Sequence, residues 1–399
     1  MYTKIVKKIK TMGNDSISEK KVSIIYITTG LSTGGAERML YNLLSRINRQ
    51  RFSPAVVSLM DRGTLAARIE ALGIPVYTLG MKAGGVPTPN VIWKLVNIIR
   101  EIQPDSIQGW MYHGNIAAQF AKVFCRLKIP VFWSIHYSVY SLDAEKKMTQ
   151  TLIKLCAPIS KFVKQVLYVS KISKMQHEAL GYAAGNGCVI PNGIDTSLFT
   201  PSLEARSSVR QQLGLPPASF LIGSICRYHP MKDHANFIKA AALLLKNYPD
   251  THFMMAGSQV DAANKTLNQL IEELGIADRI HLLGERSDMP RLMAALDIMT
   301  SASAYGEAFP LVLGEAMSSG VPCTVTDVGD SGWIVGNTGW VVPPKNPEAL
   351  AEAWQEAIEL GADGREKLGK AARSRIIECF SLESIVADYE NLYETAMTQ

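Results

Sequence analysis

The chain has 399 residues, of which 47% are hydrophobic and 19% are charged. This balance is typical of a globular protein, and the length allows two domains. No apolar run approaches the roughly 18 residues that a membrane-spanning helix needs. The lysine-rich start MYTKIVKKIK lacks the apolar stretch of a secretory signal. We therefore expect a cytoplasmic protein in which residues 1–20 form a flexible basic tail.

Charge is distributed unevenly along the chain. Residues 1–195 carry 25 Lys and Arg against 11 Asp and Glu, whereas the remainder carries 16 against 25. The basic first half could meet an anionic membrane surface or an anionic acceptor, although solvated lysines would give the same count. Its basic residues are dispersed and form no nucleic-acid-binding motif, so we expect no nucleic-acid partner. Six cysteines without paired spacing predict neither a zinc site nor a disulfide framework.

Strands and helices are predicted to alternate along the first half. Residues 22–28 read VSIIYIT, a β-branched run typical of a buried strand, and helical periodicity begins at Ala36. Further strands are predicted at 54–60, 75–80, 105–110, 130–136 and 161–169, with helices near 64–72, 90–101, 115–126 and 171–180. Such alternation indicates parallel βαβ units.

The pattern restarts after about residue 200. Strands are predicted at 219–227, 252–257, 280–284, 297–303, 322–327 and 340–344, with helices at 233–247, 266–275, 289–296 and 310–319. Apolar positions at helical spacing predict a terminal helix at 381–396. The fold class is therefore α/β, with two doubly wound Rossmann-like domains at 21–195 and 196–380.

The first candidate site is the loop after the first strand, because open α/β sheets bind ligands beyond the carboxyl ends of their strands. Gly34 and Gly35 let the backbone turn sharply and come close to a ligand. The free N–H groups of the next helix favour an anion such as a diphosphate. The loop does not read GxGxxG or GxxxxGK[ST], which disfavours a dinucleotide site or a P-loop. A tight turn without a ligand would use the same glycines.

Two later loops carry charged side chains. Arg227 and Lys232 follow the first strand of the second half, and together they could neutralise the charge that grows on a departing diphosphate. Glu307 and Glu315 lie eight positions apart, the first in a loop and the second on the helix that opens near Pro310. Carboxylates at such places can accept hydrogen bonds from the hydroxyls of a sugar and of a ribose.

These motifs, taken in order, resemble a known family. The set Gly34-Gly35-Ala-Glu-Arg38, Pro191-Asn-Gly-Ile-Asp195, Arg227 with Lys232, and Glu307 to Glu315 is similar to the GT4 family of retaining GT-B glycosyltransferases. The resemblance covers residues 22–396. It implies a GT-B fold with an acceptor-binding first domain, a second domain that binds a nucleotide-diphosphate sugar, and a terminal helix at 381–399 that crosses back to the first domain. It also implies that no metal or other cofactor is needed, and the sequence contains no DxD.

The resemblance assigns roles to individual residues. Arg227 and Lys232 would bind the donor diphosphate and stabilise it as the leaving group, and Glu315 would hold the ribose hydroxyls. The transferred sugar would be held or approached by residues from both domains: Glu307, Phe309, Pro310, Leu311, Gly34 and Gly35.

The resemblance extends to three further residues, and the sequence departs from the family pattern at two positions. His136 matches the family's active-site histidine, although a histidine at a strand end is more often structural, and His113 with Asn115 would line the acceptor side. Ala308 and Asp233 stand where the family commonly has glycine, so a hexosyl and an N-acetylhexosaminyl donor both stay open.

The acceptor and two other functions also stay open. A basic half beside an acidic half resembles peripheral enzymes that glycosylate polyprenyl-linked glycans in surface polysaccharide assembly, but polysaccharides or small molecules would also serve as acceptors. A GT-B-fold sugar-nucleotide epimerase would need carboxylates in the first half, where Glu37 and Asp61 are the nearby candidates. A non-catalytic sugar-nucleotide-binding protein could have the same fold.

Overall fold

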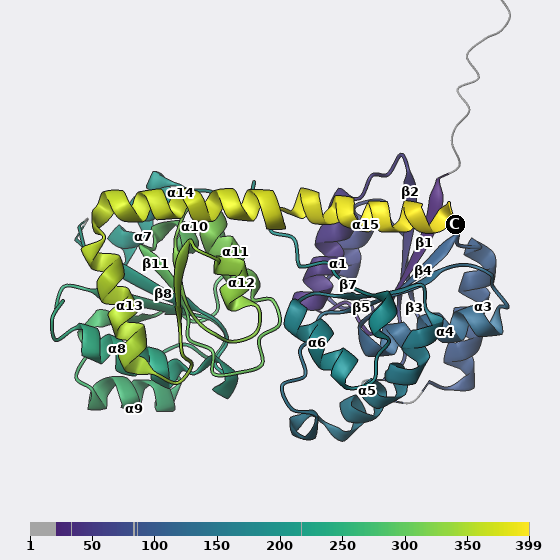
Figure 1. Ribbon diagram of the computed structural model, residues 1–399, viewed down its shortest axis with the longest axis horizontal. Helices are drawn as coiled ribbons and strands as arrows, with labels where there is room; N and C mark the ends of the chain where they lie inside the picture. The colour runs from purple at the N-terminus through teal and green to yellow at the C-terminus, as the bar shows by residue number, and fades with distance from the viewer. Residues whose placement is uncertain (1–20, 33, 83, 86, 217, 399) are drawn as a thin grey trace, which may run out of the picture.

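The computed structural model describes residues 21–32, 34–82, 84–85, 87–216 and 218–398, so the predicted tail at 1–20 lies outside the described residues. Two sheets, each flanked by helices, occupy separate halves of the molecule (Figure 1). All of the described strand pairs are parallel. In this part of the chain, every helix is too short or too polar to span a bilayer.

The first sheet has the strand order β3-β2-β1-β4-β5-β6-β7. Its strands are β1 Val22–Thr28, β2 Phe52–Ser58, β3 Val76–Thr78, β4 Ser106–Trp110, β5 Val131–Ile135, β6 Gln165–Tyr168 and β7 Gly187–Val189. Its helices are α1 Gly35–Arg46, α2 Ala66–Glu70, α3 Pro89–Ile102, α4 Met111–Phe124, α5 Lys147–Ile159 and α6 Lys171–Ala179. The winding direction reverses between β1 and β4, so the loops after these strands diverge and leave room for a ligand.

The second sheet repeats this plan in the order β10-β9-β8-β11-β12-β13. Its strands are β8 Leu221–Ile225, β9 His252–Ala256, β10 Ile280–Leu282, β11 Ile298–Ser301, β12 Cys323–Thr326 and β13 Gly339–Val342. Its helices are α7 Leu203–Gln212, α8 His234–Leu244, α9 Lys265–Glu273, α10 Met289–Ala295, α11 Leu311–Ser318, α12 Ser331–Val335 and α13 Pro347–Glu359. Here the reversal lies between β8 and β11. The sequence pattern had not predicted α5, α7, α12 or α13.

Both faces of each sheet are covered, which explains the continuous apolar runs of the strands. In β1, Ile25 and Ile27 pack with α3, α4 and α5 on one face, whereas Ile24 and Tyr26 pack with α1 on the other. All four side chains have no exposed surface. The first strand therefore shows no apolar-polar alternation, because neither of its sides meets water.

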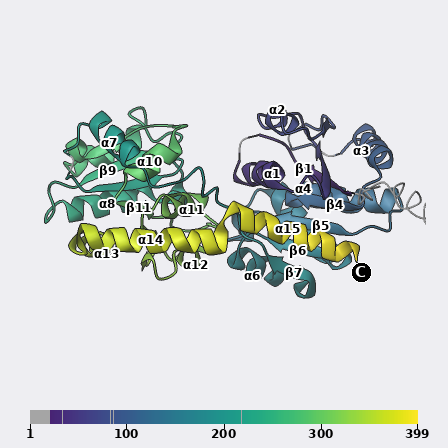
Figure 2. The ribbon, with the colours of Figure 1, turned by 90° about the horizontal axis from the view of Figure 1, so that it is seen from above.

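Two helices run end to end along both halves, as Figures 1 and 2 show. Helix α14 (Gly361–Phe380) packs into the core of the second half, and α15 (Leu382–Met397) packs against the first sheet. The hydroxyl of Tyr393 in α15 donates to Oε1 of Gln108 in β4 at 3.1 Å. The last helix thus completes the core of the half in which the chain begins.

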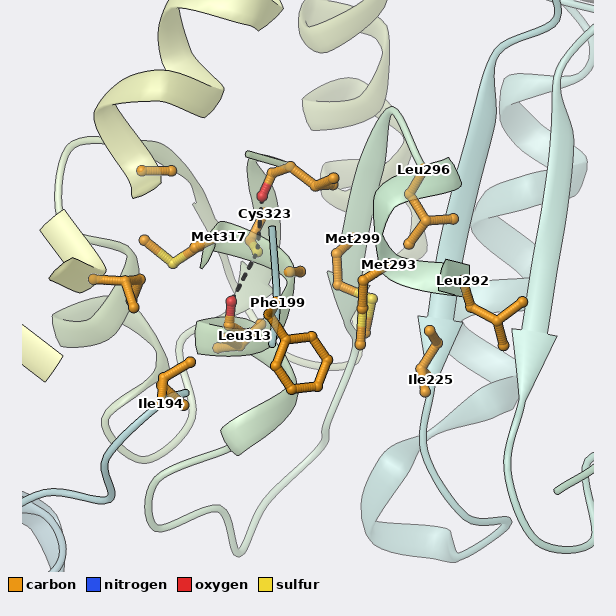
Figure 3. Packing of buried hydrophobic residues seen from close by; sticks show 14 of the residues in the cluster. Ile194, Phe199, Ile225, Leu292, Met293, Leu296, Met299, Leu313, Met317 and Cys323 are labelled. Atoms are coloured by element: carbon orange, nitrogen blue, oxygen red, sulfur yellow. Dashed lines mark hydrogen bonds between the residues drawn. The ribbon is translucent and has the colours of Figure 1, made fainter. Parts of the chain in front are cut away.

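The chain crosses between the halves at two adjacent places. The amide of Ile194 donates to the carbonyl of Phe380 at 2.9 Å, and the amide of Leu382 donates to the carbonyl of Ile194 at 2.8 Å. Ile194 also packs with Leu313 in the core of the second half (Figure 3). A Cβ atom at Gly314 would lie 2.5 Å from Cγ1 of Ile194, so the close approach of α11 to this crossing requires glycine there.

Acidification should destabilise the fold through His177 in α6. Its imidazole is fully buried, with Nε2 2.7 Å from the Tyr112 hydroxyl and Nδ1 2.7 Å from the Ser173 carbonyl. Burial lowers its pKa to about 4, whereas a histidine in an unfolded chain has a pKa of about 6.5. Because the unfolded state then takes up the proton first, stability is lost as the pH falls. From about pH 7 to about pH 5, this group should remove about 2 kcal/mol from the free energy of unfolding.

Chemical denaturation at both pH values measures this effect. The variant His177→Gln keeps a polar side chain but cannot titrate, so its pH-dependent loss should be about 2 kcal/mol smaller than that of the parent protein. Equal losses in the two proteins would show that His177 does not carry the pH dependence.

Candidate functional site

A cleft of about 630 Å³ is lined by residues of both halves. The first half contributes Gly35, His136, Tyr140 and Asn192, and the second contributes Arg227, Tyr305, Glu307, Phe309 and Leu311. Several of these residues lie in the loops after β1, β5, β8 and β11, at the carboxyl ends of parallel strands. The topology therefore collects side chains from distant parts of the sequence in one place.

A buried carboxylate that lines this cleft pairs with a lysine that does not line it. Nζ of Lys232, in the turn after β8, forms an ion pair with Oε1 of Glu307, which follows β11. The Ser303 hydroxyl donates to the same Oε1 atom at 2.6 Å. Arg227 is exposed and, among the described residues, forms no ion pair. Glu307 is thus already paired with a cation, whereas Arg227 and Lys146 line the cleft without an ion pair to another described residue.

The backbone of Gly329 packs closely against the loop that contains Glu307. This glycine has φ +62°, and a Cβ atom there would lie 2.2 Å from the carbonyl oxygen of Glu307. The next residue, Asp330, reaches the other half of the molecule. Its carboxylate accepts hydrogen bonds from the amides of Lys171 at 2.6 Å and Ile172 at 3.1 Å, at the start of α6. Burial raises the pKa of Asp330, and these two amide donors oppose that rise.

Two further contacts join the halves beside the cleft. The Ser138 hydroxyl lies 3.2 Å from the carbonyl oxygen of Gly306 and 3.1 Å from that of Glu307. A guanidinium nitrogen of Arg38, on α1, lies 3.5 Å from Oε1 of Glu315, on α11. Burial raises the pKa of Glu315, and the charge of Arg38 opposes that rise. Both predicted donor-site carboxylates therefore lie close to a cationic side chain: Glu307 to Lys232, and Glu315 to Arg38.

Sequence comparison identifies both halves. The family model described as Glycosyltransferase Family 4 matches residues 33–198, and the one described as Glycosyl transferases group 1 matches residues 205–375. The chain belongs to glycosyltransferase family 4. The predicted resemblance to this family is confirmed, and the matched residues include every strand of both sheets except β1.

Curated relatives of this family 4 chain act on different substrates. It is 27% identical over 209 residues to the UDP-Gal:alpha-D-GlcNAc-diphosphoundecaprenol alpha-1,3-galactosyltransferase of Escherichia coli, which is 51% of this chain and 53% of that protein. It is 30% identical over 215 residues to the lipopolysaccharide core biosynthesis mannosyltransferase LpsB of Rhizobium meliloti, which is 51% of this chain and 60% of that protein. The matches thus span little more than half the length of either relative.

Solved structures extend the likeness to nearly the whole family 4 chain. HepE from Anabaena, solved in complex with UDP, is 25% identical with a TM-score of 0.82, and the match covers 94% of this chain and 100% of that one. The same protein in complex with UDP-glucose gives a TM-score of 0.79 at 25% identity, covering 94% of this chain and 99% of that one. The GT-B fold predicted from the sequence is confirmed.

His136 is presented to the cleft of this family 4 chain as a neutral imidazole. Burial lowers its pKa to about 4, although the hydrogen bond with Asn192 opposes this shift. Nδ1 lies 3.2 Å from Oδ1 of Asn192, so the ring carries its proton on Nδ1 if the amide oxygen accepts. Nε2 is then an acceptor, and it is buried without a hydrogen-bond partner among the described residues. The ring stacks on Trp110 with 4.3 Å between centroids, which fixes its orientation.

The structure does not place His113 and Asn115 in the lining of this cleft. Helix α4 begins at Met111 rather than near residue 115, so both residues belong to its first turns. Asn115 is fully buried, and its Nδ2 donates to the carbonyl of Ser134 at 3.3 Å. His113 instead lines a separate apolar hollow between α3, α4 and α5.

The glycine loop reaches the cleft for a different reason than the one predicted from the sequence. Gly34 has φ −137°, an extended conformation that any residue can adopt, so no sharp turn is required. A Cβ atom at Gly35 would meet nothing within 4 Å, so this position borders open space in the cleft. Pro310 directly precedes α11. Among the described residues, Pro310, Glu37 and Asp61 do not line the cleft.

The two departures from the family pattern have different structural settings. Asp233 has φ +46°, a left-handed conformation that explains why glycine is frequent there and that Asp tolerates better than most residues. Its carboxylate also accepts a hydrogen bond from the amide of Asn236 at 3.2 Å at the start of α8. Ala308 has no positive φ and lines the cleft, where its methyl group occupies space that glycine would leave open.

Sequence reasoning missed several residues of the cleft. Asn192 lies in the segment Pro191–Asp195 that supported the family resemblance, so its position could have been noted. No pattern pointed to Tyr140 and Tyr305, whose rings come from the two halves and lie 5.3 Å apart between centroids. Asp330, which joins the halves without lining the cleft, was also missed, because its partners lie about 160 positions earlier in the chain.

Proposed function

We propose that this chain transfers a hexosyl or N-acetylhexosaminyl group from a nucleotide-diphosphate sugar to an acceptor hydroxyl, with retention of the anomeric configuration. The observation that carries the proposal is the meeting of Arg227 and Glu307 in one cleft between two Rossmann-like halves, with Lys232 paired to Glu307. The complexes of HepE with UDP and UDP-glucose support a nucleotide-sugar donor.

The two cations would bind the diphosphate of the donor. Arg227 is open to the cleft, and Lys232 would contact the phosphate by sharing or exchanging its contact with Glu307. Negative charge grows on the diphosphate as the glycosidic bond breaks, so these fixed cations are stabilising in the transition state. In this proposal they supply the charge that a metal ion would otherwise supply, and Glu315 would hold the ribose. Closure of the halves would assemble the complete site.

The reaction proposed is a same-face substitution. The bond between the anomeric carbon and the leaving phosphate oxygen breaks, the acceptor oxygen bonds to that carbon, and the acceptor proton passes to the phosphate oxygen. Glu307 is an unsuitable nucleophile, because its Oε1 is held by Lys232 and Ser303. It would instead accept hydrogen bonds from the transferred sugar, and the ring of His136 would line the same space.

The acceptor proposed is a lipid-linked glycan at the cytoplasmic face of a membrane, within surface polysaccharide assembly. Support comes from the E. coli relative, whose name specifies a diphosphoundecaprenol-linked acceptor. The positive balance of residues 1–195 is also consistent with an anionic surface nearby.

A thermal-shift screen with UDP-, GDP-, ADP- and dTDP-sugars tests the donor. A ligand at about a hundredfold excess over its Kd should stabilise the folded chain by about 2.7 kcal/mol. Lys232→Ala should weaken this response, and Leu203→Ala, on the surface of the second half, should not. If no nucleotide sugar stabilises the protein, the proposal is wrong. Proton NMR of the product tests retention, and an inverted anomer would contradict it.

A further inference from the structure

Large apolar side chains are exposed on one surface of the first half. We call this surface the α4–α5 face, and define it by Phe120, Val123, Phe124, Met148, Leu155 and Phe162. Phe124 is 53% exposed, Leu155 48% and Phe162 70%. The rings of Phe120 and Phe124 stack on each other with 4.1 Å between centroids. These side chains therefore form an ordered apolar surface in contact with water.

The apolar surface continues into a hollow between α3, α4 and α5. The hollow has a volume of about 340 Å³, and its walls include Met81, Phe120, Leu152 and Leu155. Because Phe120 and Leu155 belong to both, the hollow opens directly onto the α4–α5 face. Leu152 and Leu155 lie on the same side of α5 as Met148, at helical spacing, so this helix presents an apolar stripe outward.

The segment that carries this apolar surface is basic. Residues 111–170 contain eight Lys and Arg but only two Asp and Glu. Lys128, Lys154 and Lys161 are exposed, and none of them forms an ion pair with another described residue. Long lysine side chains can lay their methylene groups along an apolar surface while their ammonium groups reach outward. The face thus combines an apolar centre with unpaired cations at its edge.

One end of the face, at the start of α5, lies next to the cleft. The loop that contains Tyr140 and Lys146 lines the cleft, and α5 begins at the following residue, Lys147. Helices α4 and α5 pack together in the lower part of the first half in Figure 1, away from α15. A surface that covers the α4–α5 face would therefore lie beside one rim of the cleft.

We propose that the α4–α5 face docks on the surface of an anionic lipid bilayer. An apolar stripe edged by lysines is the pattern of a helix that lies in a membrane interface, with its apolar side chains among the acyl chains and its cations among the headgroups. The net positive charge selects anionic lipid over neutral lipid and over a predominantly basic protein partner. This docking goes beyond the proposed transfer reaction, and it involves none of the residues assigned to the donor.

Flotation of the full chain with vesicles tests this proposal. Vesicles of phosphatidylcholine mixed with phosphatidylglycerol should carry the protein upward, whereas vesicles of phosphatidylcholine alone should carry much less. Lys154→Glu with Lys161→Glu should weaken binding by about fivefold or more per lysine. Phe124→Ala with Phe162→Ala should weaken it by about tenfold or more. Added salt should reduce binding of the parent protein, because it screens the lysines.

A matched control comes from the second half of the chain. Leu203, which is 84% exposed, and Lys246, also exposed, lie far from this face, so Leu203→Ala with Lys246→Glu should bind vesicles like the parent protein. Equal binding by all variants, equal binding to both kinds of vesicle, or no flotation with anionic vesicles would each overturn the proposal. The thermal response to a nucleotide sugar, measured without vesicles, reports on the cleft alone and separates the two proposals.

Discussion

Replacing Lys232 with alanine should lower kcat by about a hundredfold to a thousandfold. In the proposed reaction, the Nζ atom faces the charge that develops on the leaving diphosphate, so its contribution is greatest in the transition state. Its present partner, Glu307, would be left without a cation beside the transferred sugar. Steady-state kinetics with the nucleotide sugar that gives the largest thermal shift measures this loss, which should fall mainly on kcat.

Two variants control for this result. Arg38→Ala removes a cation that touches Glu315 from the other half of the molecule, at 3.5 Å, and should have a smaller effect on kcat. Lys232→Arg keeps the positive charge and should recover part of the lost activity. A Lys232→Ala protein that is as active as the parent would remove the leaving-group role, provided that both proteins melt at similar temperatures.

Replacing Trp110 with alanine should lower the free energy of unfolding by about 3–5 kcal/mol. Trp110 is fully buried at the end of β4, and its indole N–H donates to the carbonyl of Ala36 at 2.9 Å. Its ring also stacks on His136. The substitution would leave a cavity where β4, α1 and His136 meet, and would remove the indole N–H that donates to the Ala36 carbonyl.

Urea denaturation measures this change, with Trp110→Phe as the comparison. Phenylalanine fills most of the volume but cannot donate the hydrogen bond, so its loss should be nearer about 1–3 kcal/mol. If the alanine variant were as stable as the phenylalanine variant, packing around Trp110 would not contribute as the structure indicates.

Strand positions could be predicted closely because buried parallel strands are continuous apolar runs. Helices α13 and α14 could not, because many of their buried positions are small residues. In α13 these include Ala353 and Ala357, and in α14 they include Gly369 and Ala372. Alanine and glycine give a weak periodic signal, so their burial becomes clear only when the neighbouring elements are in place.

Part of the candidate site could likewise be predicted from the sequence, and part could not. Charged residues in loops after strands could be located from the sequence, since the topology of parallel sheets fixes where such loops gather. Their pairing could not, because Lys232 and Glu307 are 75 positions apart and His136 and Asn192 are 56 apart. The start of α4 could not be placed closely either: it lies at Met111 rather than near residue 115, so His113 belongs to the first turn of the helix.

The paired crossings at Ile194 and Phe380 have a mechanical consequence. Because the two segments are hydrogen-bonded to each other, the halves share one pivot rather than two separate tethers. Relative motion is then chiefly a swing about this pivot. Asn192, two positions from Ile194, lies close to this pivot, so its hydrogen bond with His136 should persist during such a motion. The contacts of Asp330 with α6 join the two halves, so they should break and re-form as the halves move.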